Sequence, residues 1–168
     1  MNPQAPGDLR QGDTRLPGTP VAKEPLAAAT PAYLAYTAPD GSARNIPVNF
    51  HWNGPDLIMG AFAGTFKIAA LRAHPAVAVT VATHHQGAKV LLLPGEVTLA
   101  DVDGLLEEHT IAQRRTMGEQ ESNSYLAATG KPGLRMVRIA LRPRWAGVLD
   151  FGNRVPERTP KIARDALA

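Results

Sequence analysis

The alternation of apolar and polar residues between positions 45 and 83 predicts a compact unit of strands around one short helix. The predicted order is strand, strand, helix and strand, at Asn45–Trp52, Asp56–Phe62, Phe66–His74 and Ala76–Thr83. Asn53 and Gly54 separate the first two strands and favour a hairpin with a type I′ turn, because both residues accept a positive φ. Pro75 ends the helix, since proline has no N–H to continue the helical hydrogen bonds.

Strand patterns on both sides of this unit predict a mainly β fold. They lie at Ala32–Thr37, Leu134–Leu141 and Trp145–Phe151, and at Val90–Leu93 with Glu96–Leu99, which together form one strand with a bulge or bend at Pro94-Gly95. Asp101 is expected to cap a helix that runs to about Met117, and Glu119–Ala128 has no regular pattern. Short connections between successive strands are typical of antiparallel sheets, so we expect a mainly β fold with a few helices, which is compatible with a β-barrel.

Proline and glycine divide the chain into three predicted parts. Residues 1–25 are rich in both and carry little apolar periodicity, so they are expected to form a flexible N-terminal arm. Residues 26–152 form the predicted barrel domain. Residues 153–168 form a basic C-terminal tail.

Composition narrows the classes of function. The 168 residues are 44% hydrophobic and 20% charged, which is ordinary for one soluble domain. The absence of cysteine excludes disulfides and thiolate catalysis. We expect no metal site, because adjacent His84 and His85 would point to opposite sides of an extended chain. No apolar run is long enough for a signal or membrane segment, so a cytoplasmic protein without membrane contact is expected.

Basic residues are concentrated after Gly130, where nine stand against three acidic ones. This segment has neither interleaved aromatic residues nor a recognisable DNA-reading motif, so we expect no nucleic-acid partner. An anionic small molecule, or solvation of an exposed strand, accounts for the excess equally well.

Lys67 is unusual for its place in the first turn of the predicted helix. A cation there faces the positive end of the helix dipole. This placement is electrostatically unfavourable for Lys67, and a bound anion would make it favourable. The backbone N–H groups after Gly64, the Thr65 hydroxyl and the Lys67 ammonium would then together form a phosphate site. The alternative is that Thr65 only caps the helix and Lys67 extends into water, at little energetic cost.

The order of motifs along the chain resembles one protein family. The motifs are Pro47-Val48-x-Phe50-x-Trp52, Asn53-Gly54, Gly64-Thr65-x-Lys67, His74-Pro75, Lys89-Val90-Leu91-Leu92-Leu93-x-Gly95 and Arg138-Ile139-x-Leu141-x-Pro143-x-Trp145. In order and spacing, from Tyr33 to Phe151, they resemble the pyridoxamine 5′-phosphate oxidase-like FMN-binding split barrels. The resemblance implies a six-stranded antiparallel split β-barrel that forms a homodimer and holds flavin at the subunit interface.

The resemblance also implies a set of cofactor-binding residues. They are Pro47, Val48, Asn49, Gly64, Thr65, Lys67, Lys89 and Trp145. Thr65 and Lys67 would hold the flavin phosphate. The strand around Pro47 would contact the ring, because a proline interrupts the ladder and leaves peptide groups unpaired. Lys89 would lie beside the flavin or form a solvated strand end, and Trp145 would stack on flavin or substrate or simply close the barrel.

The chain departs from authentic oxidases at several positions. Phe66 stands where they carry an arginine, Gly60 and Ala61 replace a tyrosine and a threonine, and Trp145–Phe151 has neither arginine nor histidine. The vitamin B6 substrate site is therefore not expected.

We expect an FMN-dependent oxidoreductase acting on an unidentified small molecule, with the flavin supplying the redox chemistry. One alternative is a reductase that uses the deazaflavin F420, whose longer anionic tail the basic segment would hold. The other is a non-enzymatic flavin- or haem-binding protein. No acid–base pair in the sequence identifies a catalytic residue.

Overall fold

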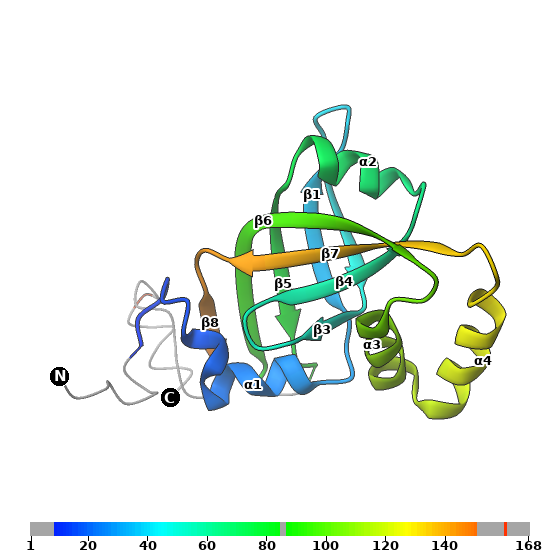
Figure 1. Cartoon of the computed structure of the whole chain (residues 1–168). Coiled ribbons are helices and arrows are strands. Elements are labelled where there is room, and N and C mark those ends of the chain that lie inside the picture. The colour runs from blue at the N-terminus through cyan, green and yellow to red at the C-terminus, as the bar shows by residue number, and fades with distance from the viewer. Residues whose placement is uncertain (1–8, 85–86, 151–159, 161–168) are drawn as a thin grey trace.

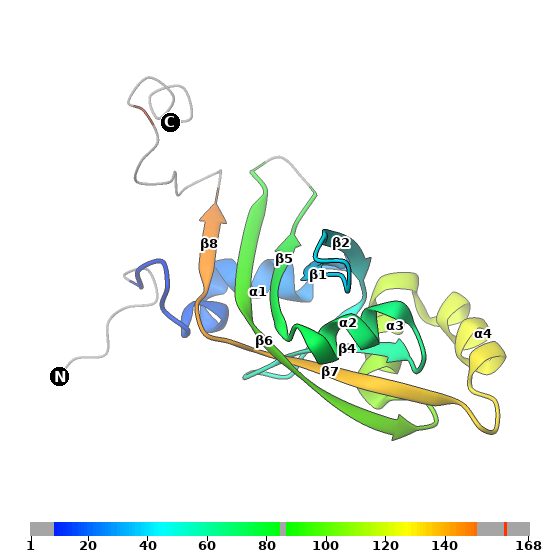
Figure 2. The same ribbon diagram turned by 90° about the horizontal axis from the view of Figure 1, so that it is seen from above.

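Eight antiparallel strands form one curled sheet in the computed structural model, which describes residues 9–84, 87–150 and 160 (Figure 1). The strands are β1 (Ala32–Thr37), β2 (Ala43–Val48), β3 (Phe50–Trp52), β4 (Leu57–Phe62), β5 (Ala76–Ala82), β6 (Lys89–Asp103), β7 (Arg135–Pro143) and β8 (Gly147–Asp150). Their order is β2-β1-β5-β6-β7-β4-β3, and β8 pairs with the first residues of β6. Figure 2 shows the curl of the sheet from above. The predicted antiparallel split barrel is confirmed, with eight strands in place of six.

The barrel closes at Asn49. β2 and β3 stand at the two ends of the strand order, yet only Asn49 separates them along the chain. Because consecutive Cα atoms lie about 3.8 Å apart, the two edges of the sheet must curl toward each other at this residue. Pro47 lies in the edge strand β2, opposite Tyr33 of β1, in the kind of strand that tolerates proline. The predicted strand Asn45–Trp52 is therefore divided in two, and we call this place the seam.

The hairpin between β3 and β4 is confirmed, with Phe50 opposite Met59. Its turn differs from the predicted type I′ turn, because Gly54 has a φ of 108° but Asn53 has no positive φ. The Asn53 side-chain oxygen instead accepts a hydrogen bond from the Asp56 N–H at 2.9 Å. A longer turn, stabilised by this asparagine, replaces the two-residue one.

The helical elements are η1 (Leu16–Gly18), α1 (Pro20–Ala27), α2 (Phe66–Ala73), α3 (Glu107–Met117) and α4 (Glu119–Thr129). α2 lies where the sequence predicts it, and α3 ends at Met117 as predicted but begins later than the predicted start. Asp101 does not cap a helix, because β6 continues to Asp103 and Asp101 pairs opposite Val137 of β7. The predicted irregular segment forms α4, a polar helix whose buried residues are Ser122 and Leu126.

Residues 9–27 pack on the barrel, which corrects the predicted flexible arm over residues 1–25 for this part of the chain. Their buried apolar side chains join the main core: Leu9, Leu16, Ala22 and Leu26. The Gln11 side chain donates to the Val148 carbonyl at 2.5 Å and accepts from the Val148 N–H at 2.8 Å. Pro20 begins α1, a position that suits proline because the first helical N–H has no partner within the helix.

Two apolar clusters organise the sheet. The larger one fills the barrel and includes Phe50, Leu71, Val79, Leu93 and Ile139, each at most 1% exposed. The smaller one consists of Ile58, Leu106, Met136 and Ala140. Ile58 stands between two strand neighbours that belong to the larger cluster, so the smaller cluster lies on the opposite face of β4. Packing there holds α3 beside β3 and β4, close to the seam.

Several predicted features lie outside the described residues. These are residues 1–8, His85, Phe151 at the end of the last predicted strand, and the basic tail over 153–168 apart from Pro160. Among the helices in the described ranges, none combines the length and apolar character needed to cross a bilayer.

Candidate functional site at the seam

A cavity of about 210 Å³ lies at the seam of the barrel. Its lining consists of Pro47, Val48, Asn49, Gly60, Ala61, Phe62, Thr65, Lys67, His109, Gln113 and Tyr125. Five of these are candidates from the sequence, namely Pro47, Val48, Asn49, Thr65 and Lys67. The fold therefore brings the interrupted strand and the start of α2 to one cavity, as the resemblance implies.

Lys67 lies in the first turn of α2 with its side chain partly buried. Burial lowers the pKa of the Lys67 ammonium, and no carboxylate in the described part of the chain offsets this effect. Thr65 occupies the cap position, but its hydroxyl donates to the Phe62 carbonyl at 3.1 Å and no side chain caps the helix. A half-buried cation beside an uncapped helix start favours an anion at this end of the cavity.

A chain of side-chain hydrogen bonds crosses the cavity wall from Asn49 to His109. The Asn49 amide donates to Gln113 Oε1 at 2.6 Å, which turns the Gln113 amide nitrogen toward His109 Nε2 at 3.2 Å. Because an amide nitrogen only donates, His109 Nε2 accepts, and the neutral ring carries its proton on Nδ1. His109 Nδ1 is buried and has no partner within the described residues. The cavity wall thus contains an N–H donor for which the described residues provide no acceptor.

The pKa of His109 lies below its ordinary value, first because the ring is buried and second because Lys67 is positively charged. The unfolded chain therefore takes up a proton at a higher pH than the folded chain does. As the pH falls below about 6.5, the ordinary histidine pKa, this difference reduces the free energy of unfolding. We expect His109→Gln to lose less stability than the unchanged chain between pH 7.5 and pH 5, measured by urea unfolding. Equal losses in the two chains would contradict the assignment.

Gly60 provides the space that His109 occupies. A Cβ at Gly60 would lie 2.8 Å from His109 Cβ and 2.9 Å from Nδ1, which is too close for a side chain. The rings of Phe62 and Tyr125 flank the imidazole, with centroids 6.3 Å and 6.1 Å from it. The departure from the oxidases at Gly60 therefore makes room for a histidine from α3.

The other three sequence candidates lie elsewhere. Gly64, with a φ of 83°, lines a neighbouring hollow of about 330 Å³ rather than the seam cavity. Lys89 begins β6 and forms an ion pair with Glu24 of α1, whose hydrogen bond raises the pKa of Lys89. Trp145 lies between β7 and β8 against Gly12, where a Cβ would come within 2.8 Å of the indole nitrogen. Lys89 and Trp145 do not line the cavity within this chain, and their cofactor contacts stay predictions.

Sequence reasoning missed the part of the cavity that comes from α3 and α4, namely His109, Gln113 and Tyr125. Gly60 offered the one signal, because a glycine inside a strand indicates a close approach by another group. Within residues 9–84 and 87–150, no group of three His, Asp or Glu side chains is placed to hold a metal ion.

Solved structures share this fold. An F420 reductase is 21% identical with a TM-score of 0.57, and the match covers 74% of this chain and 94% of the reductase. A conserved hypothetical protein from Mycobacterium tuberculosis is 13% identical with a TM-score of 0.59, over 96% of this chain and 99% of that one. A pyridoxamine 5′-phosphate oxidase-related, FMN-binding protein from Nostoc punctiforme is 14% identical with a TM-score of 0.54, over 73% and 76%.

Neither a family model nor a curated protein sequence matches the chain. At identities this low, likeness to solved structures establishes the fold alone. The chain therefore has the split-barrel fold of FMN-binding proteins related to pyridoxamine 5′-phosphate oxidase, a fold that an F420 reductase also has. The predicted resemblance is confirmed at this level.

Proposed function

We propose that this chain is an FMN-binding oxidoreductase that acts on a small molecule in the cytoplasm. The observation that carries the proposal is Lys67, a half-buried cation without a carboxylate partner in the described chain, beside an uncapped helix start in the seam cavity. A phosphate matches both features, because it accepts charge-assisted hydrogen bonds and is favoured at helix N-termini. FMN-binding proteins with the same fold add support.

The residues of the cavity fit the phosphate end of FMN and the polar edge of its ring. Lys67 and the first N–H groups of α2 would bind the phosphate. The backbone around Pro47 and Asn49 would serve the ring edge, since the seam interrupts the strand there. His109 Nδ1–H would donate to an acceptor on the ligand. Bound FMN supplies the electron transfer, so a protein nucleophile is not required.

The size of the cavity supports a homodimer with flavin at the interface. Its volume of about 210 Å³ is smaller than the roughly 300–1,000 Å³ typical of sites that enclose a whole small molecule. One chain would therefore hold one end of the cofactor, and a second chain would cover the rest of the ring. Lys89 and Trp145, which lie away from the cavity in their own chain, are candidates for contacts across that interface.

An F420-dependent reductase is the second candidate, favoured by the F420 reductase among the solved structures with this fold. The basic residues of β7 and of the turn that follows this strand support the F420-dependent reductase less than the sequence suggests. Four arginines there are each paired with a carboxylate: Arg135 with Asp103, Arg138 with Glu108, Arg142 with Asp56 and Arg144 with Glu96. Their charges are therefore largely balanced within the chain, and a long anionic tail would have to compete for them.

Titration of the purified, cofactor-free protein with FMN, and separately with F420, tests the proposal. We expect saturable quenching of FMN fluorescence at one FMN per chain, tighter binding of FMN than of F420, and a mass of two chains by light scattering. Tighter binding of F420 than of FMN would favour the F420-dependent reductase. A monomer that binds neither molecule would overturn the proposal. If FMN binds, reducible substrates can be screened with NADH and NADPH.

A further inference from the structure

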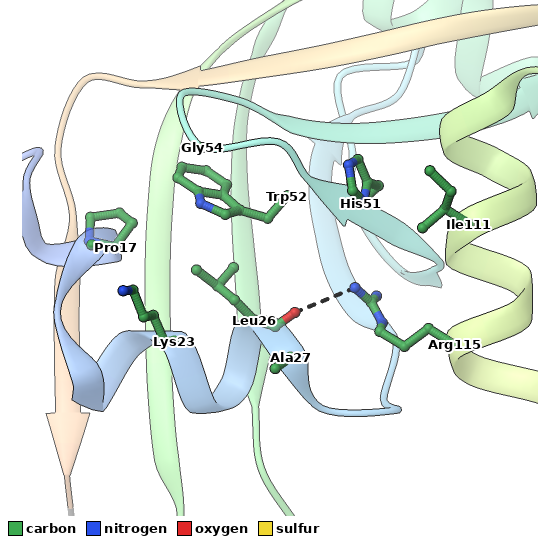
Figure 3. Close-up of a pocket in the computed structure, with 10 residues that line it drawn as sticks. Pro17, Lys23, Leu26, Ala27, His51, Trp52, Gly54, Ile111 and Arg115 are labelled. Atoms are coloured by element: carbon green, nitrogen blue, oxygen red, sulfur yellow. Dashed lines mark hydrogen bonds between the residues drawn. The ribbon is translucent and has the colours of Figure 1, made fainter.

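A second hollow, of about 650 Å³, lies between α1, β3 and α3 and shares no residue with the seam cavity (Figure 3). Its apolar wall includes Pro17, Leu26, Ala27, Trp52 and Ile111. In Figure 3, Trp52 projects from β3, Leu26 from α1 and Ile111 from α3. The volume lies within the roughly 300–1,000 Å³ of small-molecule sites, so the hollow is large enough for a small-molecule ligand.

The titratable side chains that line this hollow are all basic. They are Lys23, His51 and Arg115, and no Asp or Glu of the described chain lines it. Glu108 lies within electrostatic reach of His51, but Glu108 is already paired with Arg138 at 2.8 Å. An anion in the hollow would meet cations without a competing carboxylate in its wall.

Arg115 lacks a carboxylate partner among the described residues. Its guanidinium lies over the Phe50 ring, 4.1 Å from the centroid, and donates to the carbonyls of Leu26 at 3.3 Å and Phe50 at 2.6 Å. Its Nε–H is buried and finds no partner in the described part of the chain. Burial lowers the pKa of Arg115. A partly buried cation balanced only by carbonyls and a ring is electrostatically unfavourable, and a bound anion would offset this.

We propose that this hollow binds a small amphiphilic anion, an apolar body that carries one carboxylate. The apolar body would lie against Leu26, Trp52 and Ile111. The carboxylate would face Lys23 at the rim and the positive field of Arg115. This site is independent of the proposed flavin function, because it uses none of the residues of the seam cavity.

Decanoate is a suitable probe, with decan-1-ol as the neutral probe of equal chain length. Trp145→Phe leaves Trp52 as the only tryptophan of the two in the chain, so that its fluorescence reports on the hollow. We expect decanoate, below its micellar concentration, to change Trp52 fluorescence saturably at one molecule per chain. Because the charge contributes to binding, decan-1-ol should bind at least about threefold more weakly. Absence of saturation, or equal binding of the two probes, would overturn the proposal.

Three variants locate the site. Ile111→Trp, at a position 40% exposed, should narrow the hollow and weaken decanoate binding, measured by isothermal titration because the added indole would mask the Trp52 signal. Lys23→Gln removes an exposed charge and should weaken binding by about twofold to fivefold. Arg114→Gln is the matched control, because Arg114 is an exposed cation on α3 that does not line the hollow. Unchanged binding in Ile111→Trp, or equal effects of Lys23→Gln and Arg114→Gln, would contradict the assignment. Each variant is first checked for an unchanged melting temperature.

Discussion

Lys67→Ala is expected to weaken FMN binding by about 10-fold to 100-fold, the amount that the loss of one charge-assisted hydrogen bond to a phosphate represents. The reason is local. Lys67 is half-buried at the start of α2, and no carboxylate in the described chain shares its charge. The effect should therefore exceed that of removing an exposed lysine, whose interactions are screened by water and salt.

Isothermal titration with FMN measures this effect in Lys67→Ala and in a control variant. Lys131→Ala is the matched control, because Lys131 is an exposed lysine that does not line the seam cavity. We expect the control to bind FMN as the unchanged chain does. Equal affinity of Lys67→Ala and the unchanged chain would remove the phosphate assignment, even if FMN binds elsewhere.

Phe50→Ala should reduce the free energy of unfolding by about 3–5 kcal/mol, the usual cost of truncating a buried phenylalanine. Phe50 is fully buried in the barrel, directly after Asn49 at the seam. Its ring also lies under the guanidinium of Arg115. Its loss would leave a cavity in the core and take away the ring that partly stabilises a buried cation.

Thermal unfolding followed by circular dichroism provides the measurement. A loss of this size corresponds to a decrease in melting temperature of roughly 6–20 °C for a domain of this length. Phe66→Ala is the matched control, because Phe66 is 92% exposed and its truncation should change stability by no more than about 0.5 kcal/mol. Similar melting temperatures for the two variants would contradict the placement of Phe50.

The elements that the sequence predicts well are those that neighbouring residues determine. The hairpin around Asn53 and the helix that stops before Pro75 follow from turn and proline chemistry within a few positions. Asp101 was misassigned because its strand depends on pairing with Val137, which is distant in sequence. The predicted flexible arm is wrong for residues 9–25 for the same reason, since Gln11 is held by the backbone of Val148.

The candidate site also combines residues that local sequence predicts with residues that only long-range packing brings together. Pro47 and Lys67 belong to one continuous stretch, and the fold closes that stretch around a single cavity. His109 and Gln113 reach the cavity from α3, whose position depends on packing across β4 and β7. No pattern within the neighbouring sequence predicts that packing. Trp145 packs against Gly12 within its own chain, and the cofactor contact that the resemblance implies for it stays a prediction.

The central claim is that the start of α2 holds the phosphate of a flavin, and the most direct test compares FMN with riboflavin on the unchanged chain. The two molecules share the ring and the ribityl chain and differ only in the phosphate. Calorimetric titration should give an affinity for FMN at least about tenfold higher than for riboflavin, a difference of about 1.4 kcal/mol. Equal affinities for the two molecules would show that the phosphate contributes nothing, and the account of Lys67 and the seam cavity would be wrong.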